Sequence, residues 1–292
     1  MTNNEFLNLE QTQSFVNWFA TIVRGERPLV PSRAGENARY LNDVLLGYAW
    51  PSKRVNISTP KGEISIDAWS DFAANETVLL GLAEGLRSCL HGSSPDNDEL
   101  AGWAQAIMVW GGVYTRVGKE KTKGNSGWLE EQKPALATYL RSAIEALEGE
   151  DDTRHLSMAN LRSNAGTTKI HSLLLSDFII YDSRVAASLA WLVQGWASEN
   201  DQEIPAHLKF ACMRANTSKA AGKRRSPDEK LFKYFVPSGH VRNHHKHATW
   251  NIRANWVIKA AIEQARAQEW NSRKVEAALF MLGDDLSFVS NA

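Results

Sequence analysis

A lysine and an aspartate, Lys169 and Asp182, stand in the part of the chain that is richest in apolar side chains. Thr167 or Thr168 is a natural N-cap after Gly166, and Asp182 is a natural N-cap for the helical pattern that follows it. The first turn of a helix presents backbone amides that favour anions. Charged groups at two such helix starts therefore suit chemistry on an anionic ligand such as a phosphate-bearing strand.

The chain between these two residues leads out and back over similar distances. About 6 helical residues after Lys169 advance it by about 9 Å. The extended link over residues 178–181 then returns about 13 Å. We therefore expect the Lys169 amine and the Asp182 carboxylate on the same side of a pair of helices.

Each of these residues also has a structural interpretation. An N-cap aspartate such as Asp182 stabilises its helix by about 1 kcal/mol without any catalytic role. Lys169 has the alternative of a solvated helix lysine. His171, inside the same apolar helix, is typical of a satisfied core or boundary histidine.

A second feature is the basic stretch over residues 206–260. It contains twelve Lys or Arg and two acids, a net charge of +10, although the whole chain sums to zero. Five of the eight histidines also lie in it. A concentrated basic face is typical of a polyanion-binding surface. The alternative is a solvated linker, and residues 217–227 have the composition of a loop.

Four histidines in this stretch raise the question of a metal site: His240, His244, His245 and His247. No cysteine or carboxylate accompanies them at ligand spacing, and adjacent histidines point in different directions. We interpret them as phosphate contacts or surface residues, and we expect neither a metal nor a cofactor.

The elements that must position these residues are mostly helical. Apolar side chains recur at helical spacing over residues 5–24, 37–50, 70–90, 96–117, 129–147, 249–268 and 271–282. Alternating patterns at 55–58 and 63–66 flank a Pro-Gly turn and predict a hairpin. Residues 118–127 have the polar composition of an exposed loop. The predicted fold class is mainly α, with one small β-hairpin near the N-terminal third.

Composition limits the class of protein further. A chain of 292 residues with 43% hydrophobic residues and 11 Trp folds around a core of its own. Two cysteines, Cys89 and Cys212, cannot form a four-thiolate metal site. No window approaches 18 uninterrupted apolar residues, and the first residues lack the pattern of a signal peptide. We expect a cytoplasmic monomer that does not span a membrane, divided into residues 1–95 and 96–292 or folded as one continuous domain.

Two short motifs carry a family resemblance: Gly166-Thr167-Thr168-Lys169 and Tyr181-Asp182-Ser183-Arg184-Val185. They resemble the helix-hairpin-helix (HhH-GPD) DNA glycosylase superfamily, in the branch with an 8-oxoguanine DNA glycosylase-like fold. There a hairpin of glycine, polar residues and lysine precedes an apolar helix, and an aspartate in a Val-Asp-Thr-His-Val-like string begins the next. The resemblance covers about 40 residues and implies a helix-hairpin-helix glycosylase-like helical bundle. The chain departs from the pattern in having one hairpin glycine and a shorter Lys-to-Asp separation.

The resemblance implies hydrolysis of the N-glycosidic bond of a base extruded from double-stranded DNA, leaving an abasic site. Asp182 would stabilise the oxocarbenium-like sugar and activate water. Lys169 would attack C1′ itself if its amine is neutral, which adds lyase activity, or else contact a phosphate. The remaining DNA contacts would come from Gly166, Thr167, Thr168, Arg184, Lys223, Arg224, Arg225, Arg242 and Lys246.

Several functions stay open at this point. A glycosylase would act either in antiviral defence, on hypermodified bases of phage DNA, or in housekeeping base-excision repair. A non-catalytic DNA-binding module on the same scaffold, or a subunit whose basic loop docks an acidic partner protein, would keep the charge without the chemistry.

Overall fold

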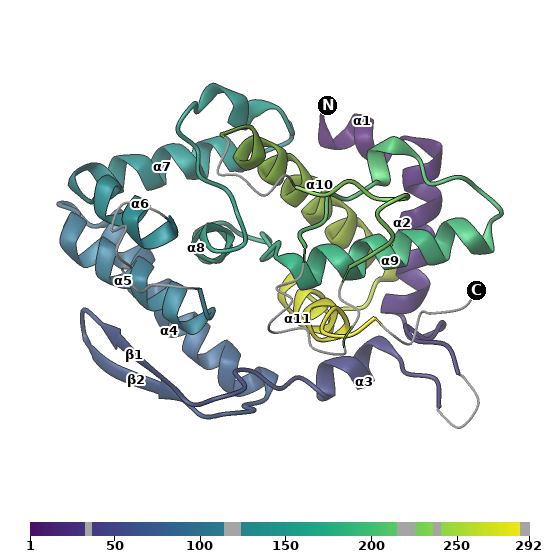
Figure 1. The fold of residues 1–292 in the computed structure, drawn as a ribbon, viewed down its shortest axis with the longest axis horizontal. Helices are drawn as coiled ribbons and strands as arrows, with labels where there is room; N and C mark the ends of the chain where they lie inside the picture. Colours follow the sequence, from purple (N-terminus) through teal and green to yellow (C-terminus); the bar gives the residue numbers. More distant parts are fainter. Residues whose placement is uncertain (33–36, 114–123, 215–222, 224–225, 236–240, 287–292) are drawn as a thin grey trace.

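The computed structural model describes residues 1–32, 37–113, 124–214, 223, 226–235 and 241–286, without the side chains of residues 241 and 242. Within these residues the chain is mainly helical and has one two-stranded antiparallel hairpin, which confirms the predicted class. Figure 1 shows a short central helix, α8 (Thr167–Leu174), between two groups of helices. One group holds α4 to α7, and the other holds α2, α9, α10 and α11.

The N-terminal part contains α1 (Asn3–Leu7), α2 (Glu10–Val23) and α3 (Leu41–Leu46). The helix predicted over 37–50 is much shorter than expected. At its start the Tyr40 N–H donates to Asp43 Oδ2 at 2.8 Å, and Gly47 caps its end. Tyr48 and Trp50 therefore lie in the segment that connects α3 to the next element, where their side chains can pack against other elements.

The hairpin is formed by β1 (Val55–Thr59) and β2 (Gly62–Ile66), as predicted. Thr59 pairs with Gly62 across the turn, and Gly62 has a φ of +126°, a conformation that glycine adopts without steric cost. Ile57 and Ile66 are buried. The hairpin packs on α4 and α5, and the chain leads from β2 into α4.

The first helical group follows the hairpin: α4 (Phe72–His91), α5 (Asn97–Trp110), α6 (Gly124–Gln132), the 3-10 turn η1 (Lys133–Ala135) and α7 (Leu136–Leu147). The predicted loop over 118–127 is wrong at its end, because residues 124–127 begin α6. Trp128 and Leu129 anchor this helix in the core. Residues 114–123 lie outside the described part of the chain.

The second half contains η2 (Arg154–Ser157), α8, α9 (Ser183–Glu199), η3 (Ala206–Leu208), α10 (Val241–Ala265) and α11 (Ser272–Leu282). Helix α10 begins well before the predicted start near 249, so His244, His245 and His247 belong to a helix. The linker interpretation is therefore wrong for this part of the basic stretch.

Elements from both ends of the chain share one core. Helix α2 packs on α10, and α3 and α9 pack on α11. The predicted division near residue 95 falls between α4 and α5, which pack against each other. In the described part of the chain we find no helix with the length and apolar character needed to cross a membrane.

Candidate active site

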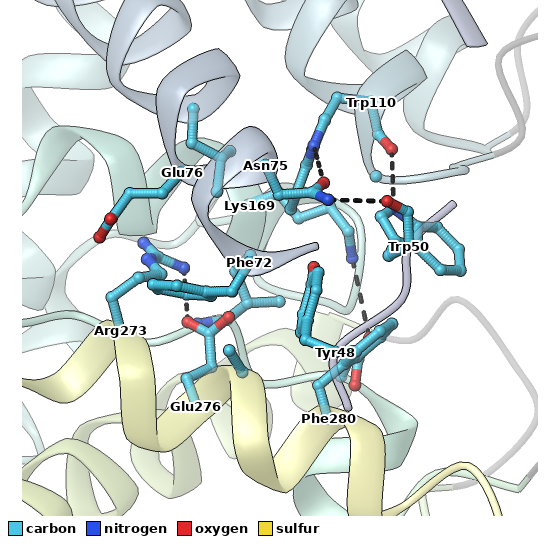
Figure 2. Close-up of a pocket in the computed structure, with 15 residues that line it drawn as sticks. Tyr48, Trp50, Phe72, Asn75, Glu76, Trp110, Lys169, Arg273, Glu276 and Phe280 are labelled. Carbon is cyan, nitrogen blue, oxygen red and sulfur yellow. Dashed lines mark hydrogen bonds and ion pairs between the residues drawn. The ribbon is translucent and has the colours of Figure 1, made fainter. Parts of the chain in front are cut away.

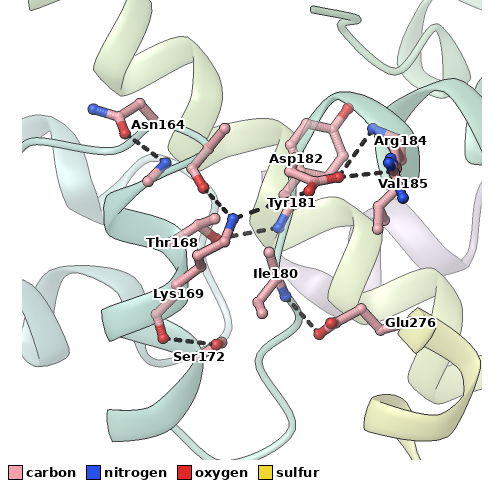
Figure 3. A network of polar contacts seen from close by, with 12 residues as sticks. Asn164, Thr168, Lys169, Ser172, Ile180, Tyr181, Asp182, Arg184, Val185 and Glu276 are labelled. Atoms are coloured by element: carbon pink, nitrogen blue, oxygen red, sulfur yellow. Dashed lines mark hydrogen bonds and ion pairs between the residues drawn. The ribbon is translucent and has the colours of Figure 1, made fainter. Parts of the chain in front are cut away.

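Asp182 occupies the N-cap of α9, as the sequence predicts. Its Oδ1 accepts hydrogen bonds from the backbone N–H groups of Arg184 at 2.9 Å and Val185 at 3.1 Å. These two bonds fix the orientation of the carboxylate and leave Oδ2 directed toward Lys169, as Figure 3 shows.

Lys169 extends from the first turn of α8 toward this carboxylate. Its Nζ lies 4.0 Å from Asp182 Oδ2 and donates a hydrogen bond to the Ala165 carbonyl at 2.8 Å. The expected proximity of amine and carboxylate is therefore confirmed. The lysine passes so close to Gly111 that a Cβ there would lie 2.1 Å from Lys169 Cδ. Only glycine at position 111 leaves room for the side chain in this position.

Burial shifts the protonation equilibrium of Lys169 toward the neutral amine. Lys169 is 7% exposed, and desolvation lowers its pKa, although Asp182 and Glu276 act in the opposite direction. A larger share of neutral amine is therefore present near neutral pH than for a solvated lysine. A neutral amine has a free lone pair and is a nucleophile.

Buried hydrogen bonds hold the two elements together. Thr168 Oγ1 accepts from the Tyr181 N–H at 3.2 Å and from Asn251 Nδ2 at 2.8 Å. His247 Nε2 lies 2.8 Å from the Tyr181 carbonyl, and Asn255 Oδ1 accepts from the Ile179 N–H at 2.6 Å. The link between α8 and α9 is thereby fixed to α10, which is why Lys169 and Asp182 meet.

Lys169 and Asp182 line a pocket with aromatic walls, shown in Figure 2. The aromatic residues are Tyr48, Trp50, Phe72, Trp110 and Phe280. Trp50 meets Phe280 edge-on with 5.4 Å between ring centroids, and Tyr48 meets Phe72 in the same way at 5.9 Å. The free volume inside is about 30 Å³, room for about two water molecules. Trp50, Phe72 and Phe280 are half-buried, so the pocket reaches the surface along them.

A second charged pair lines the same pocket, and in Figure 2 it lies beside Phe72. Glu276 Oε2 accepts from the Ile180 N–H at 2.7 Å and from Arg273 Nη1 at 2.5 Å. Burial raises the pKa of Glu276, against the opposing effects of Arg273 and the Ile180 amide. Sequence analysis missed this pair. Its only local signal is a carboxylate within the apolar run that begins at Val275.

The hairpin residues predicted to bind DNA phosphate are used inside the protein. Asn164 Oδ1 accepts from the N–H groups of Gly166 at 2.8 Å and Thr167 at 3.1 Å. Thr167 and Thr168 are fully buried. A Cβ on Gly166 would lie 2.0 Å from Asn125 Nδ2, so any larger residue here would displace the Asn125 side chain. In this arrangement the three residues are engaged inside the protein, and direct phosphate contacts from them stay a prediction.

Arg184, a further predicted phosphate contact, instead supports the pocket wall. Its Nη2 lies 2.6 Å from Asp284 Oδ1, and its guanidinium carbon lies 4.4 Å from the Phe280 ring centroid and 5.6 Å from that of Trp50. Lys223 forms an ion pair with the same Asp284. Asp284 therefore forms ion pairs with two of the side chains predicted to contact phosphate, Arg184 and Lys223.

The other predicted DNA contacts are only partly described. Lys246 is half-buried, with its Nζ 5.0 Å from the ring centroid of Phe235. Arg224, Arg225 and the side chain of Arg242 lie outside the described residues. A DNA-binding role for these four residues stays a prediction.

Of the four histidines in question, His244, His245 and His247 make contacts inside the protein, and His240 lies outside the described residues. His247 also contacts Ser163 Oγ at 2.8 Å, and His245 lies 3.2 Å from His155 between their Nδ1 atoms. His171 is buried, as the core interpretation expects, but its Nδ1 has no hydrogen-bond partner among the described residues, so the expectation of a satisfied histidine is wrong. Burial lowers its pKa to about 4. No group of three or more metal-binding side chains occurs among the residues that the structure describes.

Comparison with known proteins does not extend the resemblance seen in the two motifs. The chain matches no family model, no curated protein and no solved structure. What the chain does must therefore be argued from its own pocket.

Proposed function

We propose that the protein is a DNA N-glycosylase with a helix-hairpin-helix glycosylase-like fold, and that Lys169 and Asp182 form its catalytic centre. One observation carries the proposal. A buried amine lies 4.0 Å from a carboxylate fixed at a helix N-terminus, and both line a pocket with aromatic walls. Once the rim of the pocket has opened, its aromatic half would hold a flat base and its carboxylate half would face the sugar.

Asp182 acts on the sugar. As the C1′–N bond lengthens, positive charge develops at C1′, and the fixed carboxylate stabilises it without having to reorient. In the hydrolytic course, the same carboxylate accepts a proton from the attacking water, the C1′–O bond forms, and the bonding electrons leave with the base.

Lys169 offers a second course through its neutral amine. Its Nζ bonds to C1′ while the C1′–N bond breaks toward the base, which leaves with a proton taken from the amine. Opening of the sugar ring then gives an imine between Lys169 and C1′. The lowered pKa of this lysine supports this course, because a protonated ammonium has no lone pair to donate.

The base would lie among the aromatic side chains and within reach of Glu276 and Arg273. The free volume of about 30 Å³ is too small for a base, so Trp50, Phe72 or Phe280 must rotate to admit one. The same small volume favours the second candidate, a DNA-binding module without chemistry. The two differ in whether free base is released.

The test is release of free nucleobase from DNA. Genomic DNAs that carry different base modifications, including phage DNAs with hypermodified bases, are incubated with the protein, and the released bases are measured by mass spectrometry. Asp182→Asn should abolish release and leave duplex binding intact. An unchanged release rate in this variant contradicts the proposal.

The substrate panel also separates the two biological roles. Release from phage DNA with hypermodified bases supports defence, and release from oxidised or alkylated host DNA supports repair. If heat or alkali produces no strand breaks in any of the DNAs, no abasic sites were formed, and the result favours the DNA-binding module without chemistry.

A further inference from the structure

Trp69 is one of the exposed large apolar residues of the described chain that the proposed function leaves unexplained. It follows β2 in the turn that leads into α4, and 66% of its surface is exposed. An exposed indole leaves a large apolar area in contact with water, so the protein forgoes the stabilisation that burying this area would give. Single exposed apolar side chains are common on protein surfaces, so the exposure of Trp69 is informative only together with its backbone conformation and its place in the chain.

The backbone at Trp69 adds to that cost. Its φ is +59°, in the left-handed region that bulky side chains rarely adopt. Surrounding hydrogen bonds hold it there. The Trp69 N–H donates to the Pro51 carbonyl at 2.6 Å, and the Trp50 N–H donates to the Ser70 carbonyl at 3.0 Å. Asn75 Nδ2 donates to the Trp50 carbonyl at 2.7 Å and the Ser70 carbonyl at 3.3 Å. Strain fixed in this way is typical of ligand-binding segments.

The turn lies at the opening of the pocket. Its hydrogen bonds join it to Trp50, and the chain runs from Trp69 directly into Phe72. Trp50 and Phe72 are two of the half-buried aromatic residues along which the pocket reaches the surface. Lys53 is exposed two residues after Pro51, the residue that accepts the Trp69 hydrogen bond. An exposed tryptophan and an exposed lysine thus lie in the two segments that lead to Trp50 and Phe72 of the pocket wall.

We propose that Trp69 is a nucleic-acid contact residue that stacks on a base next to the extruded nucleotide, while Lys53 contacts a phosphate. The inference rests on the proposed function. Extrusion removes a stacking partner from the neighbouring base, and an indole replaces it regardless of sequence. The strained turn holds the ring in place before DNA arrives, so less side-chain freedom is lost on binding.

Trp69→Gly tests this proposal, because glycine adopts the same φ without strain. The variant should unfold at the same temperature as the parent or higher. Its affinity for a duplex that carries one tetrahydrofuran abasic analogue should fall by about 5- to 150-fold, the equivalent of one stacked base. Trp69→Phe, which keeps an aromatic ring, should lose much less. Leu80→Ala serves as the control, since Leu80 is 65% exposed but lies along α4.

Fluorescence anisotropy at fixed salt measures these affinities. Unchanged affinity of Trp69→Gly overturns the inference, and so does an affinity loss that Leu80→Ala reproduces. Neither result bears on base release, which is tested by Asp182→Asn. Base release that survives Asp182→Asn defeats the proposed function even if Trp69→Gly binds weakly. A protein that binds no duplex at all defeats both.

Discussion

The inner end of the pocket and its rim are built in different ways. At the inner end, buried hydrogen bonds from α10 fix the α8–α9 link, and the Asp182 carboxylate accepts two amide N–H groups. At the rim, Trp50, Phe72 and Phe280 are half-buried; Trp50 meets Phe280 edge-on, and Phe72 meets Tyr48 in the same way. Hydrogen bonds in a buried, low-dielectric interior are strong and directional, and they hold one geometry. Contacts between aromatic rings are weaker and tolerate a wider range of orientations. The comparison teaches that the chemistry is preorganised and that access must come from movement of the rim.

Acid should disrupt the inner end most strongly. Burial lowers the pKa of His171 to about 4 and of His247 to about 3, from an ordinary value near 6.5. Above pH 6.5 both histidines are neutral in the folded and unfolded chain, and their contribution to stability is complete. As the pH falls, the unfolded chain binds protons that the folded chain cannot. The free energy of unfolding should then fall by about 1.4 kcal/mol per pH unit for each histidine, about 4 kcal/mol in total at pH 5.

Urea unfolding at pH 7, 6 and 5 measures this loss. His171→Leu should remove about 1.4 kcal/mol per pH unit from the slope, the share of one histidine. His247 still titrates in this variant, as do His155, His207 and His244, whose pKa values burial also lowers. The exposed His91 provides the control, since His91→Gln should leave the slope unchanged. A His171→Leu protein with the parent's slope would show that the inner end is not closed to protons.

Thr168→Val should cause the next largest effect. The hydroxyl accepts from the Tyr181 amide and the Asn251 side chain, and valine leaves both donors buried without a partner. We expect a loss of about 3 kcal/mol in the free energy of unfolding. Thr77→Val, at an exposed position of α4, is the matched control and should change stability little. Equal effects of the two substitutions would contradict a pinned inner end.

Gly111→Ala should displace the lysine with a smaller cost in stability. The new Cβ would lie 2.1 Å from Lys169 Cδ, which forces the side chain away from Asp182. Overpacking of this kind costs about 1–3 kcal/mol. Covalent trapping of the protein on DNA by borohydride should fall along with stability. Gly81→Ala, where no described atom lies within 4 Å of the new Cβ, should leave trapping intact. Full trapping by Gly111→Ala would place the reactive amine elsewhere.

Phe280→Leu should have the smallest effect on stability, because the ring is half-buried. We expect a loss of about 1 kcal/mol. A smaller side chain opens the rim, so the substrate concentration at half-maximal rate should change more than the rate at saturation. If the saturating rate falls instead and binding stays constant, the rim takes part in the chemistry.

The sequence predicts what local patterns determine. The hairpin turn, the N-cap at Asp182 and the proximity of Lys169 follow from short stretches of chain and simple lengths. Partners that are distant in sequence are not predictable in this way. Arg184 meets Asp284, and Thr168 meets Asn251, across gaps that carry no periodic signal. The exposure of Trp69 and the burial of Glu276 likewise depend on how whole elements pack.

Single-turnover release of free base by Asp182→Asn tests the central claim most directly. Asparagine is also a good N-cap, so the variant should keep its fold and its affinity for duplex DNA. Asp96→Asn is the matched control, because Asp96 likewise caps a helix through two amide N–H groups but lies outside the pocket. The account predicts that release falls at least about 100-fold in Asp182→Asn and is unchanged in Asp96→Asn. Release at the parent's rate in Asp182→Asn would contradict it.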